Sequence, residues 1–123
     1  MLKRFIPIVA FMPFAWACAR SWPEPKQPMA EAESASRSAR EVGADSQPAA
    51  KLEVNLADEQ IMAAKSAIAK GDNERATYLL VRARADAELA LALAHEQNAL
   101  DEKQKAVEQS STTLEANTQG AKP

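Results

Sequence analysis

The side chains with the widest chemical range in this sequence stand apart from any catalytic pattern. His95 is the single histidine, and an acid–base or metal-binding role would need carboxylate or thiol partners held close to it. Glu88, Glu96 and Glu102 share its stretch of chain, but the spacing of a zinc-binding His-Glu-x-x-His helix is absent. We therefore interpret His95 as a solvent-facing residue.

The serines and glycines also lack the neighbours that their chemistry requires. A nucleophilic serine needs a glycine-rich elbow, and none surrounds Ser34, Ser36 or Ser38. Gly43 and Gly71 are isolated and form no phosphate-binding loop. The sequence thus predicts no catalytic residue, no metal site, no cofactor and no small-molecule substrate.

Charge is nearly balanced along the chain, with 15 Lys+Arg against 17 Asp+Glu and a formal net charge of −2. Proteins that bind nucleic acid or an anionic membrane surface through charge are normally basic, so we expect no nucleic-acid partner. Acidic pairs such as Asp58-Glu59 and Asp101-Glu102 are typical of solvated helix faces.

The single cysteine, Cys18, lies where an export signal would end. A short basic segment over residues 1–4 precedes an apolar run over residues 5–14, and Ala15-Trp16-Ala17 leads to the cysteine. This order is typical of a cleaved secretory signal peptide. The apolar run is shorter than the about 20 residues of a membrane-spanning helix. We predict a signal peptide over residues 1–17 and cleavage between Ala17 and Cys18.

Two peptidases would cut at that bond and leave different products. Ala15-x-Ala17 fits the ordinary signal peptidase, which would leave Cys18 as a free thiol. Ala15-Trp16-Ala17-Cys18 also resembles a bacterial lipobox, in which the cysteine is lipidated, although that pattern favours Leu at the first position and a small residue at the second. Because the single cysteine falls on the junction itself, we expect a lipid on Cys18 that anchors the chain to a membrane. In enterobacteria-like sorting, Ala19 in place of Asp implies the outer membrane, facing the periplasm.

A proline-rich stretch follows over residues 18–27 and predicts an extended tether. Polyproline II rises about 3.1 Å per residue, so this stretch would hold the next domain about 25–30 Å from the bilayer. Trp22 fits two interpretations, an interfacial anchor near the lipid headgroups and an exposed aromatic residue of a linker.

Beyond the tether the apolar spacing is helical. It predicts helices over residues 28–42, 48–70 and 73–109, which together form an alanine-rich domain over residues 28–109. Residues 110–123 are rich in Gln, Ser and Thr, and we expect them to form a disordered polar tail.

Glycine and proline mark the ends of these helices. Gly43 and Gly71 are the expected C-terminal stops, because glycine adopts the left-handed conformation that ends many helices. Pro48 suits a first helical turn, and Asp72 is the expected N-cap of the third helix.

The middle segment has apolar residues on two sides. One stripe consists of Ala50, Val54, Ala57, Ile61, Ala64 and Ile68, and the other of Ala49, Leu52, Leu56, Ala63 and Ala67. The outer segments have one principal stripe each, Ala32, Ala35, Ala39 and Val42 in the first and Ala76, Leu80, Ala83, Ala87, Ala90 and Ala94 in the third.

This pattern predicts an all-α fold with an antiparallel up-down-up three-helix arrangement. A helix that is apolar on two sides packs between two neighbours, so the middle helix should contact both others, in a flat layer more than in a tight triangle. Beyond Ala94 the apolar rhythm shifts to Leu93, Leu100 and Val107. We expect that part of the third helix to project past the other two, free or paired with a partner helix.

Two junctions resemble those of a known family. Residues 39–45 (AREVGAD) with residues 48–52 (PAAKL), and residues 70–76 (KGDNERA), are similar to a family of unknown function, whose members are small alanine-rich bacterial envelope lipoproteins. The resemblance covers residues 29–94. It implies a helical fold and an envelope location, and the family's domain sometimes occurs beside peptidoglycan-binding modules of the outer-membrane-protein-A type. It implies no catalytic residue.

Together these features lead us to expect a non-enzymatic envelope lipoprotein that presents a helical surface to an envelope protein or to peptidoglycan. The alternative is a structural coiled-coil lipoprotein that bridges the outer membrane and peptidoglycan, like the major murein lipoprotein. That family forms one uninterrupted helix and ends on a lysine, whereas Gly43 and Gly71 interrupt this chain and Lys122 precedes Pro123.

Overall fold

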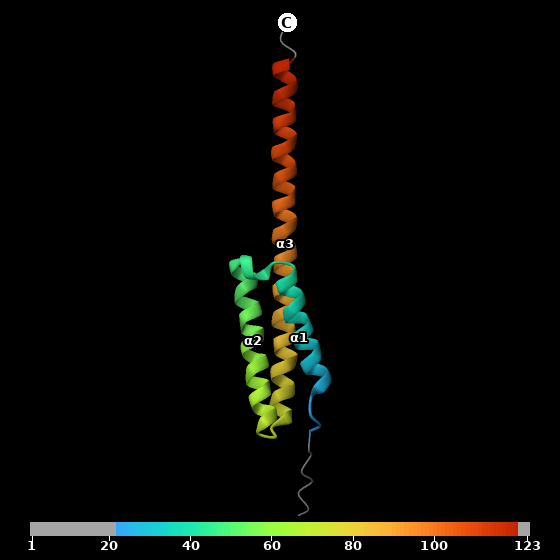
Figure 1. Ribbon diagram of the computed structural model, residues 1–123, viewed down its shortest axis with the longest axis vertical. Coiled ribbons are helices and arrows are strands. Elements are labelled where there is room, and N and C mark those ends of the chain that lie inside the picture. Colours follow the sequence, from blue (N-terminus) through green and yellow to red (C-terminus); the bar gives the residue numbers. More distant parts are fainter. Residues whose placement is uncertain (1–21, 121–123) are drawn as a thin grey trace, which may run out of the picture.

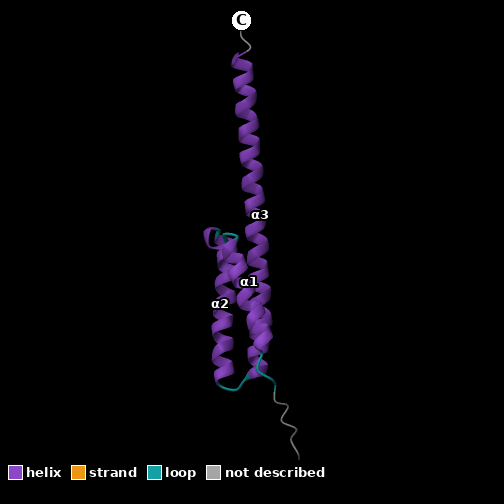
Figure 2. Cartoon of the chain, turned by 45° about the vertical axis from the view of Figure 1, so that its right-hand side comes forward, coloured by secondary structure: helices purple, strands orange, loops and turns teal. Residues whose placement is uncertain are grey.

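The computed structural model describes residues 22–120, and its regular elements over that range are all helical. They are α1 (Lys26–Glu41), the short 3-10 helix η1 (Ala44–Ser46), α2 (Pro48–Ala69) and α3 (Asn73–Gly120). Figure 1 shows α1, α2 and the first half of α3 side by side, running up, down and up. Figure 2 shows short loops between them. The predicted all-α, antiparallel up-down-up arrangement is confirmed.

The break between α2 and α3 is built by two consecutive residues. Gly71 has a φ of +76°, and its N–H donates to the Ile68 carbonyl while the Asp72 N–H donates to the Ala67 carbonyl, each at 2.9 Å. This pair of hydrogen bonds ends α2 around a glycine in the left-handed region. The Asp72 carboxylate then accepts a hydrogen bond from the Arg75 N–H at 3.2 Å, so Asp72 is the N-cap that the sequence predicted.

The break between α1 and α2 follows the same principle. Gly43 has a φ of +96° and donates its N–H to the Arg40 carbonyl at 2.9 Å. Its own carbonyl accepts the Ser46 hydroxyl at 2.7 Å, within η1. Pro48 is the first residue of α2, as expected. The N–H of a first helical residue has no hydrogen-bond partner within the helix, so proline loses no hydrogen bond there.

The buried core consists almost entirely of alanine. Leu80 and Val54 are the largest fully buried side chains among the described residues. All members of the stripe predicted for the third helix are buried: Ala76, Leu80, Ala83, Ala87, Ala90 and Ala94. Because an alanine side chain is a single methyl group, the three backbones approach closely and each contact buries little apolar area.

The prediction that α2 lies between two neighbours on opposite sides is wrong. Its second stripe is largely exposed, and Leu52, for example, keeps 58% of its surface in solvent. The helix with the most extensive contacts to both others is α3, and α1 also contacts α2, so that Ala32, Ile61 and Leu80 share one buried cluster. The three helices therefore surround a common core. Alanine favours helix wherever it lies, so exposed alanines such as Ala63 imitated a buried stripe.

α3 is longer than the sequence predicted. It continues to Gly120, so the structure places residues 110–120 of the expected disordered tail in a helix, whereas residues 121–123 lie outside the described part. The Ser and Thr hydroxyls of this part donate to carbonyls of the preceding turn, as Thr112 does to Glu108 at 2.9 Å. At about 1.5 Å per residue, the 48 residues of α3 span about 72 Å.

The predicted tether is in part a component of the fold. α1 begins at Lys26, two residues before the expected start, and Pro25 is buried. The Trp22 carbonyl accepts a hydrogen bond from the Asn73 side chain at 2.9 Å, and its ring centroid lies 6.1 Å from that of Tyr78. Trp22 and Pro25 are therefore held against the bundle, so this part of the chain provides no extended spacer. The predicted signal peptide, 1–17, and Cys18 lie outside the described residues.

Candidate interaction surface

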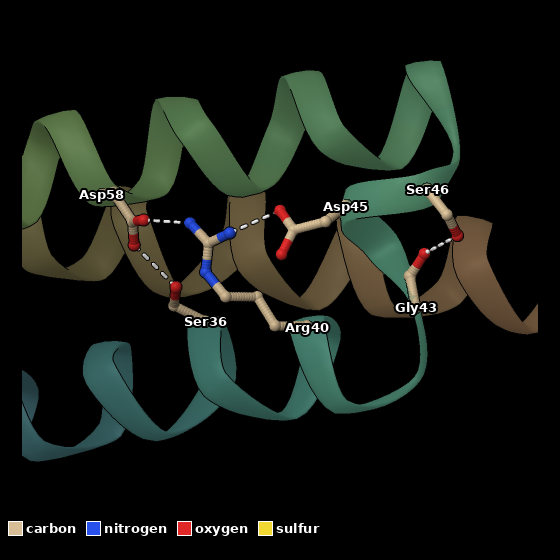
Figure 3. A network of polar contacts seen from close by, with 6 residues as sticks. All are labelled: Ser36, Arg40, Gly43, Asp45, Ser46 and Asp58. Carbon is tan, nitrogen blue, oxygen red and sulfur yellow. Dashed lines mark hydrogen bonds and ion pairs between the residues drawn. The ribbon is translucent and has the colours of Figure 1, made fainter.

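A polar network links α1 to η1 and α2 (Figure 3). The Arg40 guanidinium lies at its centre and pairs with the carboxylates of Asp45 and Asp58. Ser36, a polar residue of α1 that is 5% exposed, donates its hydroxyl to Asp58 at 2.6 Å. The hydrogen bond to Asp58, followed by that to Asp45, raises the pKa of the Arg40 guanidinium above its ordinary value, because both carboxylates stabilise its charged form.

This network has a structural role in the arrangement of the helices. A serine nucleophile needs a neighbouring base to take its proton, but the carboxylate that receives the Ser36 hydroxyl is already paired with Arg40. His95, the other candidate considered from the sequence, is exposed on α3, as expected. Over residues 22–120, no three metal-binding side chains converge. The network's evident effect is to fix α1 against α2.

A second polar cluster marks the point where α3 leaves the bundle. The Asn98 side-chain amide donates to the Val42 carbonyl at 3.0 Å and accepts a hydrogen bond from the Gln47 side chain at 3.1 Å. Among residues 73–118, Asn98 is the last half-buried residue. We call residues 99–120 the α3 extension.

The α3 extension has a sparse apolar stripe along one side. Leu100, Val107 and Leu114 lie seven residues apart, close to two helical turns for each step, and each exposes more than half of its surface. We call these three residues the extension stripe. Among the charged residues of this part, Lys103 alone lies beside the stripe by helical geometry, because Asp101, Glu102, Lys105, Glu108 and Glu115 project farther round the helix.

Part of this surface was predictable from the sequence. The spacing of Leu100 and Val107 predicted a projecting helix, and the structure confirms that projection (Figure 1). Leu114 was not part of that prediction, because the polar composition from Ser110 onward indicated disorder. The available signal was the seven-residue step from Val107 to Leu114.

The other end of the molecule carries the start of the described chain. Trp22 lies beside Tyr78 at the same end of the bundle as the turn at Gly71, and the α3 extension leaves from the opposite end (Figure 1). Ala17 and Cys18, the predicted processing and lipidation residues, precede Trp22 and lie outside the described part. No helix within residues 22–120 combines the length and the apolar character that a bilayer crossing requires.

Comparison with known families finds one match. A family described as a domain of unknown function, DUF4398, matches residues 27–106, which comprise nearly all of α1, all of α2 and α3 as far as Ala106. The resemblance to an uncharacterised family inferred from the junctions at Gly43 and Gly71 is thereby confirmed. Comparison with curated proteins and comparison with solved structures each give no match.

Proposed function

The chain belongs to the DUF4398 family, and we propose that it is a lipid-anchored, non-enzymatic binding protein of the bacterial envelope. In this proposal the signal peptide over residues 1–17 is removed and Cys18 carries the lipid, at the outer membrane and facing the periplasm. The bundle then holds the α3 extension toward an envelope protein or peptidoglycan.

The observation that carries this proposal is the α3 extension. At about 1.5 Å per residue, residues 99–120 extend about 33 Å beyond the last contact with the bundle. Helices in water owe most of their stability to the packing of an apolar face, yet each residue of the extension stripe leaves more than half of its surface exposed among the described residues. An exposed helix with a regularly spaced apolar stripe is suited to lie in the groove of a partner.

The placement of the chain start and the α3 extension at opposite ends of the bundle supports an anchored role. The described chain starts at Trp22 at one end of the bundle, and the α3 extension leaves the other end (Figure 1). A lipid on Cys18 would therefore place the extension on the side of the bundle away from the membrane. The full length of α3, about 72 Å, would separate the membrane-proximal turn from the tip of the extension.

The pairing of the polar groups supports a non-enzymatic role. Arg40, Asp45, Asp58 and Ser36 satisfy one another at the α1–α2 contact and leave no free acid, base or nucleophile among them. Among the described residues, the core between the helices is filled mainly by alanine side chains, which leave little room for an enclosed small-molecule pocket.

The composition of the extension favours a different protein over a second copy as its partner. A self-associating coiled coil has two apolar positions in every seven. The extension has one, since the residues three and four places beyond Leu100 and Val107 are Lys103, Gln104, Ser110 and Ser111. Two copies meeting along the stripe would bury few apolar side chains, so the partner must supply most of the apolar surface.

The seven-residue spacing of the stripe also supports the second candidate, a structural coiled coil that bridges the outer membrane and peptidoglycan. Sedimentation of the purified lipid-free chain distinguishes the two. An elongated monomer supports the binding protein, and a trimer together with covalent recovery in digested peptidoglycan supports the bridge.

Site-specific photo-crosslinking in intact cells tests the proposal. A photoreactive residue at Gln104, beside the extension stripe, should give a discrete adduct with one envelope component. The same residue at Lys51, which is exposed on α2, should give none. Identical adduct patterns from both positions, or no adduct from position 104, would contradict a role for the α3 extension in binding.

A further inference from the structure

We infer that the end of the bundle that carries Trp22, Tyr78 and the turn at Gly71 lies directly on the bilayer surface, with both aromatic rings among the lipid headgroups. We call this part of the molecule the aromatic end. The inference rests on the proposed lipidation of Cys18 and adds to it a second membrane contact, made by the folded domain itself.

The length of chain before the described residues restricts the distance. Cys18 and Trp22 are four residues apart, and a fully extended chain spans at most about 3.6 Å per residue, so their Cα atoms lie within about 14 Å whatever the conformation. Trp22 is held on α3 by the hydrogen bond from Asn73 and by its contact with Tyr78. A lipid on Cys18 therefore brings the aromatic end to the membrane.

The thickness of the bilayer makes contact the natural result. The polar layer on each side of the hydrocarbon core is about 5–8 Å thick, which is a large part of the 14 Å available. The predicted spacer of about 25–30 Å would have kept the domain clear of the headgroups. Because Trp22 and Pro25 are held on the bundle, that clearance is lost.

The two rings have the chemistry that this location favours. Their planes are tilted by 47°, and Trp22 and Tyr78 remain 37% and 63% exposed. Trp and Tyr are enriched at bilayer interfaces, because the ring body enters the apolar boundary while the N–H or O–H stays hydrogen-bonded to headgroups or water. A contact that served only to hold the chain start in place would not need the Tyr78 ring to face solvent.

The charges at the aromatic end nearly balance, which determines the kind of contact. Among the described residues near the turn at Gly71, three basic and three acidic residues are exposed, namely Lys26, Lys70, Arg75, Glu24, Asp72 and Glu74. Arg20, two residues before Trp22, adds one basic residue. An excess of one basic residue attracts anionic lipids only weakly, so the contact depends mainly on the aromatic rings and the lipid chain. It should therefore change little with salt, which screens charge but leaves apolar contacts in place.

Spin-label accessibility of the lipidated protein tests this inference. The processed protein is reconstituted in vesicles of phosphatidylethanolamine and phosphatidylglycerol. With Cys18 acylated, a cysteine introduced as Arg75→Cys carries the label at the aromatic end, and Gln104→Cys is the control on the extension. We expect the ratio of collisions with oxygen to collisions with a water-soluble nickel complex to rise several-fold at position 75 on reconstitution and to stay constant at position 104. Equal, aqueous values at both positions would overturn the inference.

Two further comparisons show whether the aromatic rings or charged groups make the contact. Tyr78→Ala in the Arg75→Cys background should lose at least half of the rise at position 75, whereas Leu52→Ala, an equally exposed apolar residue near the other end of α2, should keep all of it. Raising the salt from 0.1 to about 1 M shortens the screening length from about 10 to about 3 Å and should leave the rise in place. Loss of the rise at high salt would show a charge contact and contradict the role given to the rings.

The outcome also distinguishes this inference from the proposed function. If the processed protein carries no acyl chain on Cys18, both proposals fail. If it is acylated and partitions with membranes but its label at position 75 remains aqueous, the anchoring proposal stands and the membrane contact of the aromatic end is wrong.

Discussion

Asn98 of α3 donates its side-chain N–H to the backbone carbonyl of Val42 at 3.0 Å, and this hydrogen bond lies at the boundary between the bundle and the α3 extension. On one side of it, α3 buries Ala94 and Ala90 against the other helices. On the other side, every side chain from Ala99 to Thr118 is exposed. α3 thus has two parts. Residues up to Asn98 pack in the bundle, and the α3 extension projects from it.

Truncation at this boundary should leave the bundle intact. A chain that ends after Ala99 loses no buried side chain, so we expect its thermal midpoint, followed by circular dichroism, to stay within a few degrees of that of the full chain. A chain that ends after Ala87 loses Ala90 and Ala94 from the core and should unfold. A large decrease in the midpoint for the longer truncation would show that the extension stabilises the bundle and is not simply presented by it.

The Arg40 network should contribute more to stability than the exposed ion pairs do. Arg40→Ala removes the cation that pairs with Asp45 and Asp58, which leaves Asp45 without its ion pair and Asp58 with the Ser36 hydroxyl as its remaining partner in the network. We expect the free energy of unfolding in urea to fall by about 1 kcal/mol or somewhat more.

Arg84 provides the matched control for Arg40. It pairs with Glu88 and Glu31 at an exposed position, where the hydrogen bond and charge of Glu88, then of Glu31, raise the pKa of its guanidinium. Because exposed pairs are well screened, Arg84→Ala should change the free energy of unfolding much less than Arg40→Ala does. Equal losses of unfolding free energy for the two variants would mean that the Arg40 network stabilises the fold no more than an exposed ion pair does.

The alanine core should tolerate enlargement poorly. Ala87 is completely buried on α3, so Ala87→Val forces the packed backbones apart and should cost about 1–3 kcal/mol. Ala85→Val introduces the same β-branched residue at an exposed position two residues away and therefore measures the helix propensity cost alone. A difference near zero between the two variants in urea unfolding would contradict the close approach of the helices.

The turn at Gly71 allows a test of backbone conformation without a steric contribution. A Cβ added at this position would meet no atom within 4 Å, so any cost arises from the φ of +76°. We expect Gly71→Ala to lower the free energy of unfolding by about 1–2 kcal/mol, and Gly71→Asn to cost less, because asparagine visits the left-handed region more readily. Equal destabilisation by the two substitutions would indicate that the positive φ at Gly71 is not the source of the cost.

Much of the fold follows from local sequence signals. Gly43, Pro48, Gly71 and Asp72 act within a few residues of themselves, so their roles as stops and caps were predictable, and the α3 core stripe was recognised by its spacing. The faces of α2 were harder, since alanine is helix-favouring in the core and on the surface alike. Spacing alone does not separate Ala63, which is exposed, from Ala64, which is buried.

The candidate surfaces show the same limit. The extension stripe was predictable as far as Val107, because it continues an apolar rhythm. The contact of Trp22 with Tyr78 joins residues that are far apart in the chain, and no local pattern indicates it. A proline-rich composition predicted an extended tether, whereas Pro25 is buried against the bundle through tertiary contacts that composition does not encode.

Mass spectrometry of the N-terminal peptide, isolated from the protein in its native membrane, tests the central claim most directly. The account predicts a peptide that begins at Cys18, lacks residues 1–17, and is heavier than its sequence by the mass of a lipid with several acyl chains. A Cys18→Ser variant should yield no such peptide and should leave the membrane fraction. A native peptide that begins at Cys18 with an unmodified thiol, or one that retains the first 17 residues, would contradict the lipid anchor.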